Sequence, residues 1–274
     1  MKIGIDLGGT NVRAGLIEKG EIRRKIMEPT KAHLSEAGVL AQIEGIIRQL
    51  LTPEVKGIGI GVPSVVDAET GTVYNVANIP SWKEVPLKKI LSKEFGLPVG
   101  VNNDCNCFAL GECYFGEGKG YKDLVCVALG TGVGAGLIID GKLFCGNNTG
   151  AGEIGCLPYL EQNYEYYCGS AFFSEMYRLT GKEAYERAWN GDPYALRLWK
   201  EIGLHIGELV KAILFAYDPQ AIIFGGSISQ AYEYFAPRMH ECLAGFPYPE
   251  TVRKVKILVS KQEDIALLGA SMLV

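Results

Sequence analysis

The sequence predicts a two-lobed α/β protein, and three observations support that fold class. The chain has 274 residues, more than one typical domain needs and enough for two. Strand and helix patterns alternate through its second half, as a sheet with crossover helices requires. A strand–glycine–threonine–strand pattern occurs near the start and again at residue 130, which suggests an internal duplication of one hairpin, with a copy in each lobe.

The first copy of this hairpin spans residues 2–17. An apolar strand pattern leads to Asp6 and is interrupted by Gly8 and Gly9. Thr10 follows with a hydroxyl group, and a second strand pattern begins after it. Because glycine has no side chain, backbone N–H groups of the turn can approach an anion closely. Asp6 is placed to hold a metal ion or a metal-bound water on a phosphate. An ordinary hairpin whose turn is capped by Asp6 is the alternative that these residues leave open.

The second copy has a strand at 123–129, a glycine-rich break at 130–136, and a strand at 137–139 that ends in the tight turn Asp140-Gly141. Each copy alone is a weak signal. Two copies, one near the start of each half, indicate a two-lobed phosphate-binding protein.

The remaining elements follow from periodicity and from helix boundaries. Helices are expected at 35–51, 86–95, 105–115, 170–179, 182–190, 193–217, 230–244 and 265–273. Further strands are expected at 21–28, 56–62, 98–101, 220–224 and 255–259, and loops at 63–79, 116–120 and 146–155. Ser35 and Asp192 are predicted N-caps, and Gly96 is a predicted helix stop. The alternating glycines of strand 56–62 suggest close packing against a helix or a ligand.

Composition excludes several classes of protein. The net charge is −4 and no Lys/Arg run occurs, which argues against a nucleic-acid or membrane surface. No apolar run approaches the roughly 20 residues of a membrane span, and the N-terminus does not read as a signal peptide, so we expect a cytoplasmic protein. The eight cysteines are then expected to be mostly reduced thiols.

Five motifs, in order and spacing, resemble those of the ROK family (repressors, open reading frames and kinases) within the actin-like ATPase superfamily, and the resemblance covers essentially the whole chain. They are residues 6–13 (Asp-Leu-Gly-Gly-Thr-Asn-Val-Arg), 103–104 (Asn-Asp), 129–136 (Leu-Gly-Thr-Gly-Val-Gly-Ala-Gly), 150–155 (Gly-Ala-Gly-Glu-Ile-Gly) and 224–227 (Phe-Gly-Gly-Ser). The resemblance implies two RNase H-like lobes with mixed sheets and ATP-dependent phosphorylation of a hexose at its 6-hydroxyl. It also implies that the C-terminal helix packs on the first lobe. We therefore expect a smaller lobe at 1–117 with 263–274, binding sugar and phosphate, and a larger lobe at 118–262, binding nucleotide and sugar.

Asp104 is the candidate general base. It lies where a strand ends and a helix begins, so its carboxylate can point into a cleft and accept the proton of a sugar hydroxyl. From position alone, a role as helix N-cap is equally good. The resemblance favours catalysis, because the corresponding Asp is the base in related kinases.

The resemblance also assigns the ATP site and its magnesium ion. Phosphate-binding residues are expected in both glycine turns, and the adenosine side is expected at a third glycine motif. These residues are Gly8, Gly9, Thr10, Thr131, Gly132, Gly225, Gly226 and Ser227. Asp6 would orient Mg²⁺ through water, and Arg13 is expected to close the hairpin rather than to act in catalysis. A plain strand-to-helix turn is the alternative for 225–227.

For the sugar, the resemblance implies contacts from Asn78, Asn103, Asp104, Glu153 and Glu175. Paired donors and acceptors reject an analogue that lacks a hydroxyl far better than apolar walls do. Asn75 is an alternative to Asn78, and each of these residues could also be a loop residue without a ligand.

The chain departs from the family at its zinc motif. Gly155 is followed by Cys156 instead of His, and of the later Cys-rich run only Cys168-Gly169 and Glu175 survive. Two cysteines cannot complete a tetrahedral zinc site, so we predict no zinc. Packing among the aromatic residues Tyr166, Tyr167, Phe172 and Phe173 is expected to replace the structural role of the metal.

Glucose is the leading substrate, with fructose, allose and N-acetylmannosamine as rivals, because the lost His normally contacts hydroxyls near the anomeric carbon. A sugar-sensing regulator is a second alternative. Regulators of this family carry an N-terminal helix-turn-helix segment, whereas this sequence starts directly at the first hairpin. A binding-only relative is a third alternative, which the intact Asp6, Asp104 and glycine turns oppose. Relatives are often dimers, so a homodimer is an open option.

Overall fold

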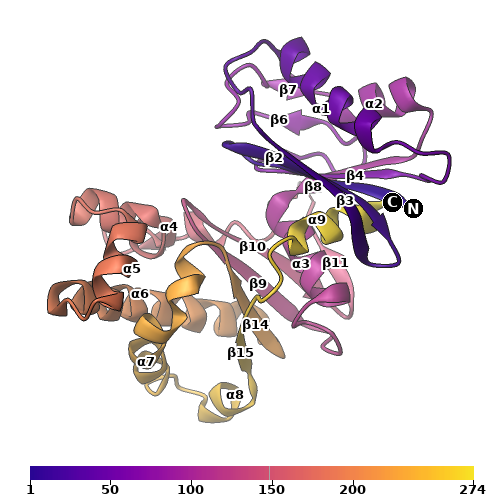
Figure 1. Cartoon of the computed structure of the whole chain (residues 1–274). Coiled ribbons are helices and arrows are strands. Elements are labelled where there is room, and N and C mark those ends of the chain that lie inside the picture. Colours follow the sequence, from indigo (N-terminus) through magenta and orange to yellow (C-terminus); the bar gives the residue numbers. More distant parts are fainter. Residues whose placement is uncertain (148) are drawn as a thin grey trace. The chain divides into compact units, whose positions relative to one another are not determined.

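The computed structural model describes residues 1–147 and 149–274 and divides into two compact units (Figure 1). Unit 1 comprises Met1–Gly120, Gly136–Ala151 and Lys261–Val274, and unit 2 comprises Tyr121–Ala135 and Gly152–Ser260. Asn148, in the predicted loop 146–155, lies outside the described residues. The predicted lobes differ from these units mainly at 136–151, which belongs to unit 1, and also at 118–120 and 261–262, which belong to unit 1 as well. The roles that we assigned to the lobes stay predictions.

Unit 1 is built on a five-stranded mixed sheet in the order β3-β2-β1-β4-β8. Its strands are β1 (Lys2–Leu7), β2 (Asn11–Glu18), β3 (Glu21–Pro29), β4 (Ile58–Val62) and β8 (Val99–Asn103). β1 is antiparallel to β2 and parallel to β4, which is in turn parallel to β8. The first predicted hairpin is therefore confirmed, and the register places Asp6 opposite Arg13.

Helices of unit 1 begin and end where their boundary residues predict. Ser35 accepts a hydrogen bond from the Gly38 backbone N–H at 3.3 Å and is the N-cap of α1 (Glu36–Leu50). α2 (Leu87–Phe95) ends at Gly96, whose φ of 64° is in the left-handed region. Both N-cap and stop are confirmed. The predicted loop 63–79 also holds two short strands, β5 (Val65–Val66) and β6 (Val73–Tyr74), which form a small sheet with β7 (Glu84–Val85).

The C-terminal helix α9 (Ile265–Ala270) packs directly on the backbone of the unit 1 sheet. A Cβ atom added to Gly59 of β4 would lie 1.7 Å from the Ala270 carbonyl oxygen, and one on Gly4 of β1 would lie 2.2 Å from that of Leu267. The predicted close packing at the glycines of β4 is thus against a helix. α9 also lies beside α3 (Asp104–Phe115) in Figure 1.

Unit 2 contains four neighbouring strands of the second five-stranded sheet, in the order β10-β9-β14-β15. Its strands are β9 (Leu124–Leu129), β14 (Ala221–Gly225), β15 (Lys256–Val259) and the first residues of β10 (Val133–Ile139). β14 is parallel to both β9 and β15. In unit 1, the end of β10 pairs with β11 (Lys142–Phe144) through the predicted tight turn, where Asp140 and Gly141 have φ values of 50° and 73°.

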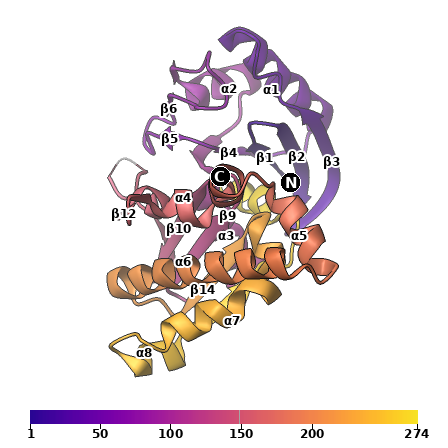
Figure 2. The ribbon, with the colours of Figure 1, turned by 90° about the vertical axis from the view of Figure 1, so that its left-hand side faces the viewer.

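Two long helices lie side by side in unit 2 (Figure 2). α6 (Pro193–Tyr217) has the predicted bounds, with Asp192 as its N-cap. α7 (Tyr232–Leu243) approaches it closely, because a Cβ on Gly203 of α6 would lie 2.4 Å from the Phe235 carbonyl oxygen. The predicted helix 230–244 instead begins as a 3₁₀ turn at Ile228–Ala231.

The predicted helix at 170–179 is confirmed in part, because residues 170–176 are helical but mostly as a π-helical turn, and the helix ends before 177. The chain forms α4 (Tyr164–Cys168) followed by a π-helical turn at Phe172–Met176, while α5 (Gly181–Trp189) and the unpredicted α8 (Pro249–Lys254) complete the helices named here. Asn163 caps α4 by accepting a hydrogen bond from the Tyr166 N–H at 2.9 Å. Gly169 then ends α4 in extended backbone, and a side chain does not fit there, because a Cβ would lie 2.6 Å from the Glu165 carbonyl oxygen. Within the described residues, no helix has both the length and the apolar character needed to cross a membrane.

Candidate active site

The first glycine turn, Gly8-Gly9-Thr10, joins β1 to β2 in unit 1. The Gly8 N–H donates to the Asn11 carbonyl oxygen at 2.9 Å, which closes the turn. Gly9 is needed for space rather than for an unusual φ, because a Cβ there would lie 2.6 Å from Cβ of Asn78. The fold therefore brings Asn78, a predicted sugar contact, against the predicted phosphate turn. Asn78 and its alternative, Asn75, are both exposed, and Asn75 has a left-handed φ of 47°.

Asp6 and Arg13 face each other across the β1–β2 hairpin. Their side chains form an ion pair with an N–O distance of 2.8 Å, so Arg13 closes the hairpin as predicted. Burial raises the pKa of the Asp6 carboxyl, and the Arg13 guanidinium opposes that rise. In proteins Mg²⁺ is commonly held by one or two carboxylates together with substrate phosphates. Asp6, beside a glycine turn, fits that donor set, whereas the described residues contain no group of three or more His, Cys, Asp or Glu that could hold a metal.

Asn103 and Asp104 lie where β8 runs into α3. Asn103 is the N-cap, since its Oδ1 accepts from the Cys105 N–H at 2.8 Å, so the alternative role of Asp104 as N-cap is wrong. Asp104 is instead the first helical residue, and its half-buried carboxylate also accepts from the Cys105 N–H at 2.8 Å. The N-terminal turn of a helix favours a negative charge and so favours the ionised form of the Asp104 carboxyl, the form that a general base needs. The Asn103 side-chain amide donates to the Ser64 carbonyl oxygen at 3.3 Å.

The second glycine turn, Gly130-Thr131-Gly132, joins β9 to β10 in unit 2. The Gly130 N–H donates to the Gly132 carbonyl oxygen at 3.0 Å, and the Thr131 side chain is exposed. Ser227 Oγ lies 3.9 Å from the position of a Cβ on Gly130, so the turn and the predicted adenosine motif lie together.

The predicted adenosine motif follows directly on β14, whose last residue is Gly225. Gly226 has a φ of 87°, and a Cβ there would lie 2.3 Å from the Leu129 carbonyl oxygen at the end of β9. Both features require glycine. The motif is thus built into the sheet edge at which the second glycine turn begins.

Glu153 lies beside the start of β10, on the segment that contains the Gly-Glu-Ile-Gly motif. The Ala135 N–H donates to the Gly152 carbonyl oxygen at 2.8 Å, and a Cβ on Gly155 would lie 2.0 Å from the Val133 carbonyl oxygen. Burial, and then the charge of Glu165, raise the pKa of the Glu153 carboxyl. Glu175 is exposed on the π-helical turn, and its predicted role stays a prediction.

Glu165 is a residue that the sequence reasoning missed. Its Oε2 accepts a hydrogen bond from the Val133 N–H at 3.0 Å, immediately after the second glycine turn. A Cβ on Gly132 would lie 2.5 Å from the same oxygen, so this glycine leaves room for a carboxylate of the protein itself. No sequence pattern marks Glu165, because the contact depends on how α4 packs against β10.

The lost zinc motif maps to an aromatic cluster in unit 2. The Phe172 and Phe173 rings lie 5.0 Å apart, Phe173 packs on Trp199 at 4.7 Å, and the Tyr166 and Tyr167 rings are 5.1 Å apart. All eight cysteines are free thiols. The replacement of a zinc ion by this packing stays a prediction.

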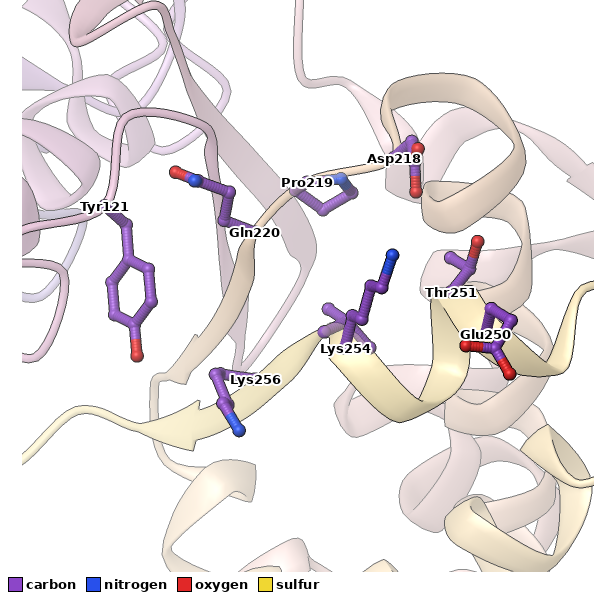
Figure 3. Close-up of a pocket in the computed structure, with 9 residues that line it drawn as sticks. Tyr121, Asp218, Pro219, Gln220, Glu250, Thr251, Lys254 and Lys256 are labelled. Carbon is purple, nitrogen blue, oxygen red and sulfur yellow. The ribbon is translucent and has the colours of Figure 1, made fainter.

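A cavity of about 440 Å³ in unit 2 lies away from these motifs (Figure 3). Its lining includes Gln220, which precedes β14, and Lys256, which begins β15. Gly225, Gly226 and Ser227 instead follow the other end of β14, so this cavity is not the predicted nucleotide site.

The sequence profile of the ROK family matches residues 2–274. The chain belongs to the ROK family. It is 30% identical to a glucokinase of Thermotoga maritima, over 99% of this chain and 96% of the relative. Among solved structures, a candidate sugar kinase of Cytophaga hutchinsonii is 33% identical, with a TM-score of 0.87 and coverage of 100% and 99%. A ROK family glucokinase of Streptomyces griseus, in complex with glucose and AMPPNP, is 27% identical, with a TM-score of 0.83 and coverage of 99% and 98%.

These similarities confirm the predicted family and the predicted fold class, that of the actin-like ATPases with mixed sheets. They also support a sugar-kinase activity for this ROK protein. Unit 1 supplies seven predicted site residues: Asp6, Gly8, Gly9, Thr10, Asn78, Asn103 and Asp104. Unit 2 supplies the others: Thr131, Gly132, Glu153, Glu175, Gly225, Gly226 and Ser227.

Proposed function

We propose that this ROK protein transfers the terminal phosphoryl group of ATP to the 6-hydroxyl of a hexose, with glucose as the leading substrate. The observation that carries the proposal is the position of Asp104, a half-buried carboxylate on the first turn of α3 at the end of β8. The similarity of this chain to glucokinases supports the reaction class, phosphoryl transfer to a sugar.

In the proposed step, Asp104 accepts the proton of the sugar 6-hydroxyl as the O–H bond breaks. The hydroxyl oxygen bonds to the terminal phosphorus, and the bond between that phosphorus and the departing ADP oxygen breaks. Phosphoryl transfer needs mostly positioning and charge stabilisation, so a single base is sufficient protein chemistry. Removing a general base typically slows a reaction by about 10²- to 10⁴-fold.

The two glycine turns and the 225–227 motif are the proposed binding residues for ATP. Thr10 and Thr131 offer hydroxyls, and the glycines leave backbone N–H groups accessible to phosphate oxygens. Mg²⁺, oriented by Asp6 through water, would neutralise phosphate charge when bound.

For the sugar, we propose Asn78, Asn103, Asp104, Glu153 and Glu175 as the contacts. Asn78 has support from its position against Gly9, and Glu153 from its position beside β10. Glu175 has the weakest support, because among the described residues it has no contact with a glycine turn or with β10, unlike Asn78 and Glu153.

A second hexose kinase specificity, for fructose, allose or N-acetylmannosamine, is favoured by one observation. Cys156 replaces the family His, and its thiol lies 3.9 Å from the Glu153 carboxylate, where it donates a weak hydrogen bond. A thiol cannot supply the two ring nitrogens of His to sugar hydroxyls. Compared with other family members, this site therefore differs most where it would contact the hydroxyls near the anomeric carbon.

The test is an ADP-release screen over hexoses and amino sugars with ATP and Mg²⁺, comparing the wild type with Asp104→Asn. Asn keeps an oxygen that can accept from the Cys105 N–H but cannot take a proton. We expect turnover with at least one sugar and a loss of at least about 10²-fold in the variant. Asp140→Asn, on the exposed β10–β11 turn where φ is 50°, is the matched control and should keep full activity.

If no sugar gives turnover above Asp104→Asn, the kinase proposal is lost. Sugar binding without turnover in that case would instead favour the sugar-sensing regulator. The screen needs a full set of hexoses, because Cys156 replaces the family His and the preferred sugar therefore cannot be chosen in advance.

A further inference from the structure

Two buried asparagine side chains join the strand and the helix on either side of Asp104, entirely within unit 1. Asn102 lies in β8, and Asn106 lies in the first turn of α3. The Asn106 side-chain amide donates a hydrogen bond to Asn102 Oδ1 at 2.8 Å. The same oxygen accepts from the Asn103 backbone N–H, also at 2.8 Å. A side-chain bridge therefore spans residues 103–105, the junction that carries Asp104.

The backbone determines how both side-chain amides are oriented. A backbone N–H is always a donor, so the Asn102 atom that faces the Asn103 N–H must be the oxygen. The Asn106 atom that faces this oxygen must then be its nitrogen. Both amide nitrogens also donate weakly to the Cys145 thiol, at N–S distances of 3.5 Å from Asn102 and 3.7 Å from Asn106. The Asn106 oxygen remains, and among the described residues it has no hydrogen-bond partner.

Stability alone does not explain an asparagine at position 106. Its side chain is 1% exposed, and a buried oxygen without a partner destabilises the native state. Leucine has a similar shape and no polar atom, so it would fill the position without that cost. Asn102 Oδ1 would still accept from the Asn103 N–H. The one contribution of Asn106 that leucine cannot replace is the bridge from α3 to the end of β8.

We propose that Asn106 is a positioning residue for the Asp104 carboxylate. Through Asn102 it fixes the peptide group before Asn103, and with it the direction in which α3 leaves the end of β8. Asp104 is the first residue of α3, so its carboxylate moves with the helix. Misplacement of a reacting group by about 1 Å can slow a reaction about 10²-fold. The proposal rests on the proposed kinase function and assigns to Asn106 no contact with sugar or nucleotide.

The kinetic test compares the wild type with Asn106→Leu, alone and combined with Asp104→Asn. The measurements are kcat with the preferred hexose, the KM for ATP, and the free energy of unfolding from denaturant titration. We expect Asn106→Leu to lower kcat at least about 10-fold, with no change in the KM for ATP and no loss of stability. In the Asp104→Asn background the same substitution should change kcat by less than about 2-fold, because residues that act as a unit are not additive.

Hydrogen exchange of backbone N–H groups, followed by NMR, is a second readout that needs no substrate. In Asn106→Leu the N–H groups of Asn103 and Cys105 should exchange about 10-fold faster, because a hydrogen bond that holds the junction is lost. Exchange in α1 should not change. Asn190→Leu is the matched control, since the exposed Asn190 amide donates to the Glu186 carbonyl oxygen at 2.8 Å at the end of α5. It should leave kcat and the exchange of both N–H groups unchanged.

The outcomes that overturn the proposal are distinct. A wild-type kcat in Asn106→Leu overturns it, and so does an equal loss in the Asp104→Asn background, because the effect would then not act through Asp104. A parallel loss of kcat, of stability and of exchange protection throughout unit 1 shows a general structural defect and also overturns it.

A wild type that phosphorylates no sugar contradicts the proposed function instead. The exchange data still decide the inference in that case. Faster exchange of the Asn103 and Cys105 N–H groups in Asn106→Leu supports the bridge, and unchanged exchange shows that Asn106 does not hold the junction.

Discussion

At the scale of single residues, Glu153 has the most informative surroundings of the predicted sugar contacts. Its pKa is raised, first by burial and second by the negative charge of Glu165, while the Cys156 thiol hydrogen bond opposes the rise. A carboxyl group with a raised pKa is ionised only above that higher value. The ionised form accepts hydrogen bonds from hydroxyls through both oxygens, so sugar capture should fail as pH falls through the raised pKa.

This gives a pH prediction for Glu165→Gln. The substitution removes the second cause of the rise, so the pKa of Glu153 should fall toward its ordinary value of 4.5. The acid limb of kcat/KM for the sugar should move to lower pH by a fraction of a unit, because that limb reports ionisations of the free enzyme. Glu161→Ala, on the exposed turn before α4, should leave the limb in place. An acid limb that stays fixed in Glu165→Gln, or moves to higher pH, contradicts the coupling.

At the scale of elements, the packing of α9 on the unit 1 sheet depends on glycines. A Cβ on Gly59 would lie 1.7 Å from the Ala270 carbonyl oxygen, which is backbone and cannot move aside cheaply. Overpacking in a well-packed core typically costs about 1–3 kcal/mol. Gly59→Ala should therefore lower the free energy of unfolding by about 2 kcal/mol or more, measured by denaturant titration.

Gly45→Ala is the matched control for that substitution. Gly45 lies inside α1, and a Cβ there would have no atom within 4 Å. Alanine is favoured over glycine in a helix interior by about 0.8–1.0 kcal/mol, so this variant should be slightly more stable. If Gly59→Ala and Gly45→Ala have equal stabilities, close packing is not the reason for the glycine in β4.

Elements with a clear local signal could be predicted from the sequence. α1 and α6 carry long apolar periodicities and local N-caps, Ser35 and Asp192, so their bounds agree closely with the structure. α4 could not be predicted in this way. It has five residues, and its aromatic run fits several conformations until packing on α6 selects one.

At the scale of the whole molecule, motif order predicted the family and the site residues, but not their contacts. The pairing of Asp6 with Arg13 follows from strand register, and the contact of Asn78 with Gly9 joins segments far apart in the chain. The structure adds most to the interpretation of the glycines in the two turns. Gly9 and Gly132, predicted for their closeness to phosphate, also leave room for Asn78 and Glu165 of the protein itself. Local sequence contains no information on such neighbours, because tertiary packing selects them.

If ring packing replaces the zinc site, the whole chain should be stable without a bound metal. Cys168 is fully buried, Cys156 is exposed, and the segment between them is held by ring contacts such as the stacked pair Tyr159 and Tyr164, 4.4 Å apart. A structural zinc contributes on the order of 10–16 kcal/mol in small zinc-dependent domains, so its removal from a protein that depends on it is easily detected.

We therefore expect the purified chain to contain far less than one equivalent of zinc by elemental analysis. Prolonged EDTA treatment should leave its melting temperature unchanged, as expected for a native state that does not depend on zinc. Activity should return fully when Mg²⁺ alone is restored. A family member with the complete Cys and His ligand set, treated in parallel, should lose stability under the same conditions. Stoichiometric zinc in this chain, or a melting temperature that falls with EDTA and recovers with zinc but not with Mg²⁺, would show that other residues supply the missing ligands.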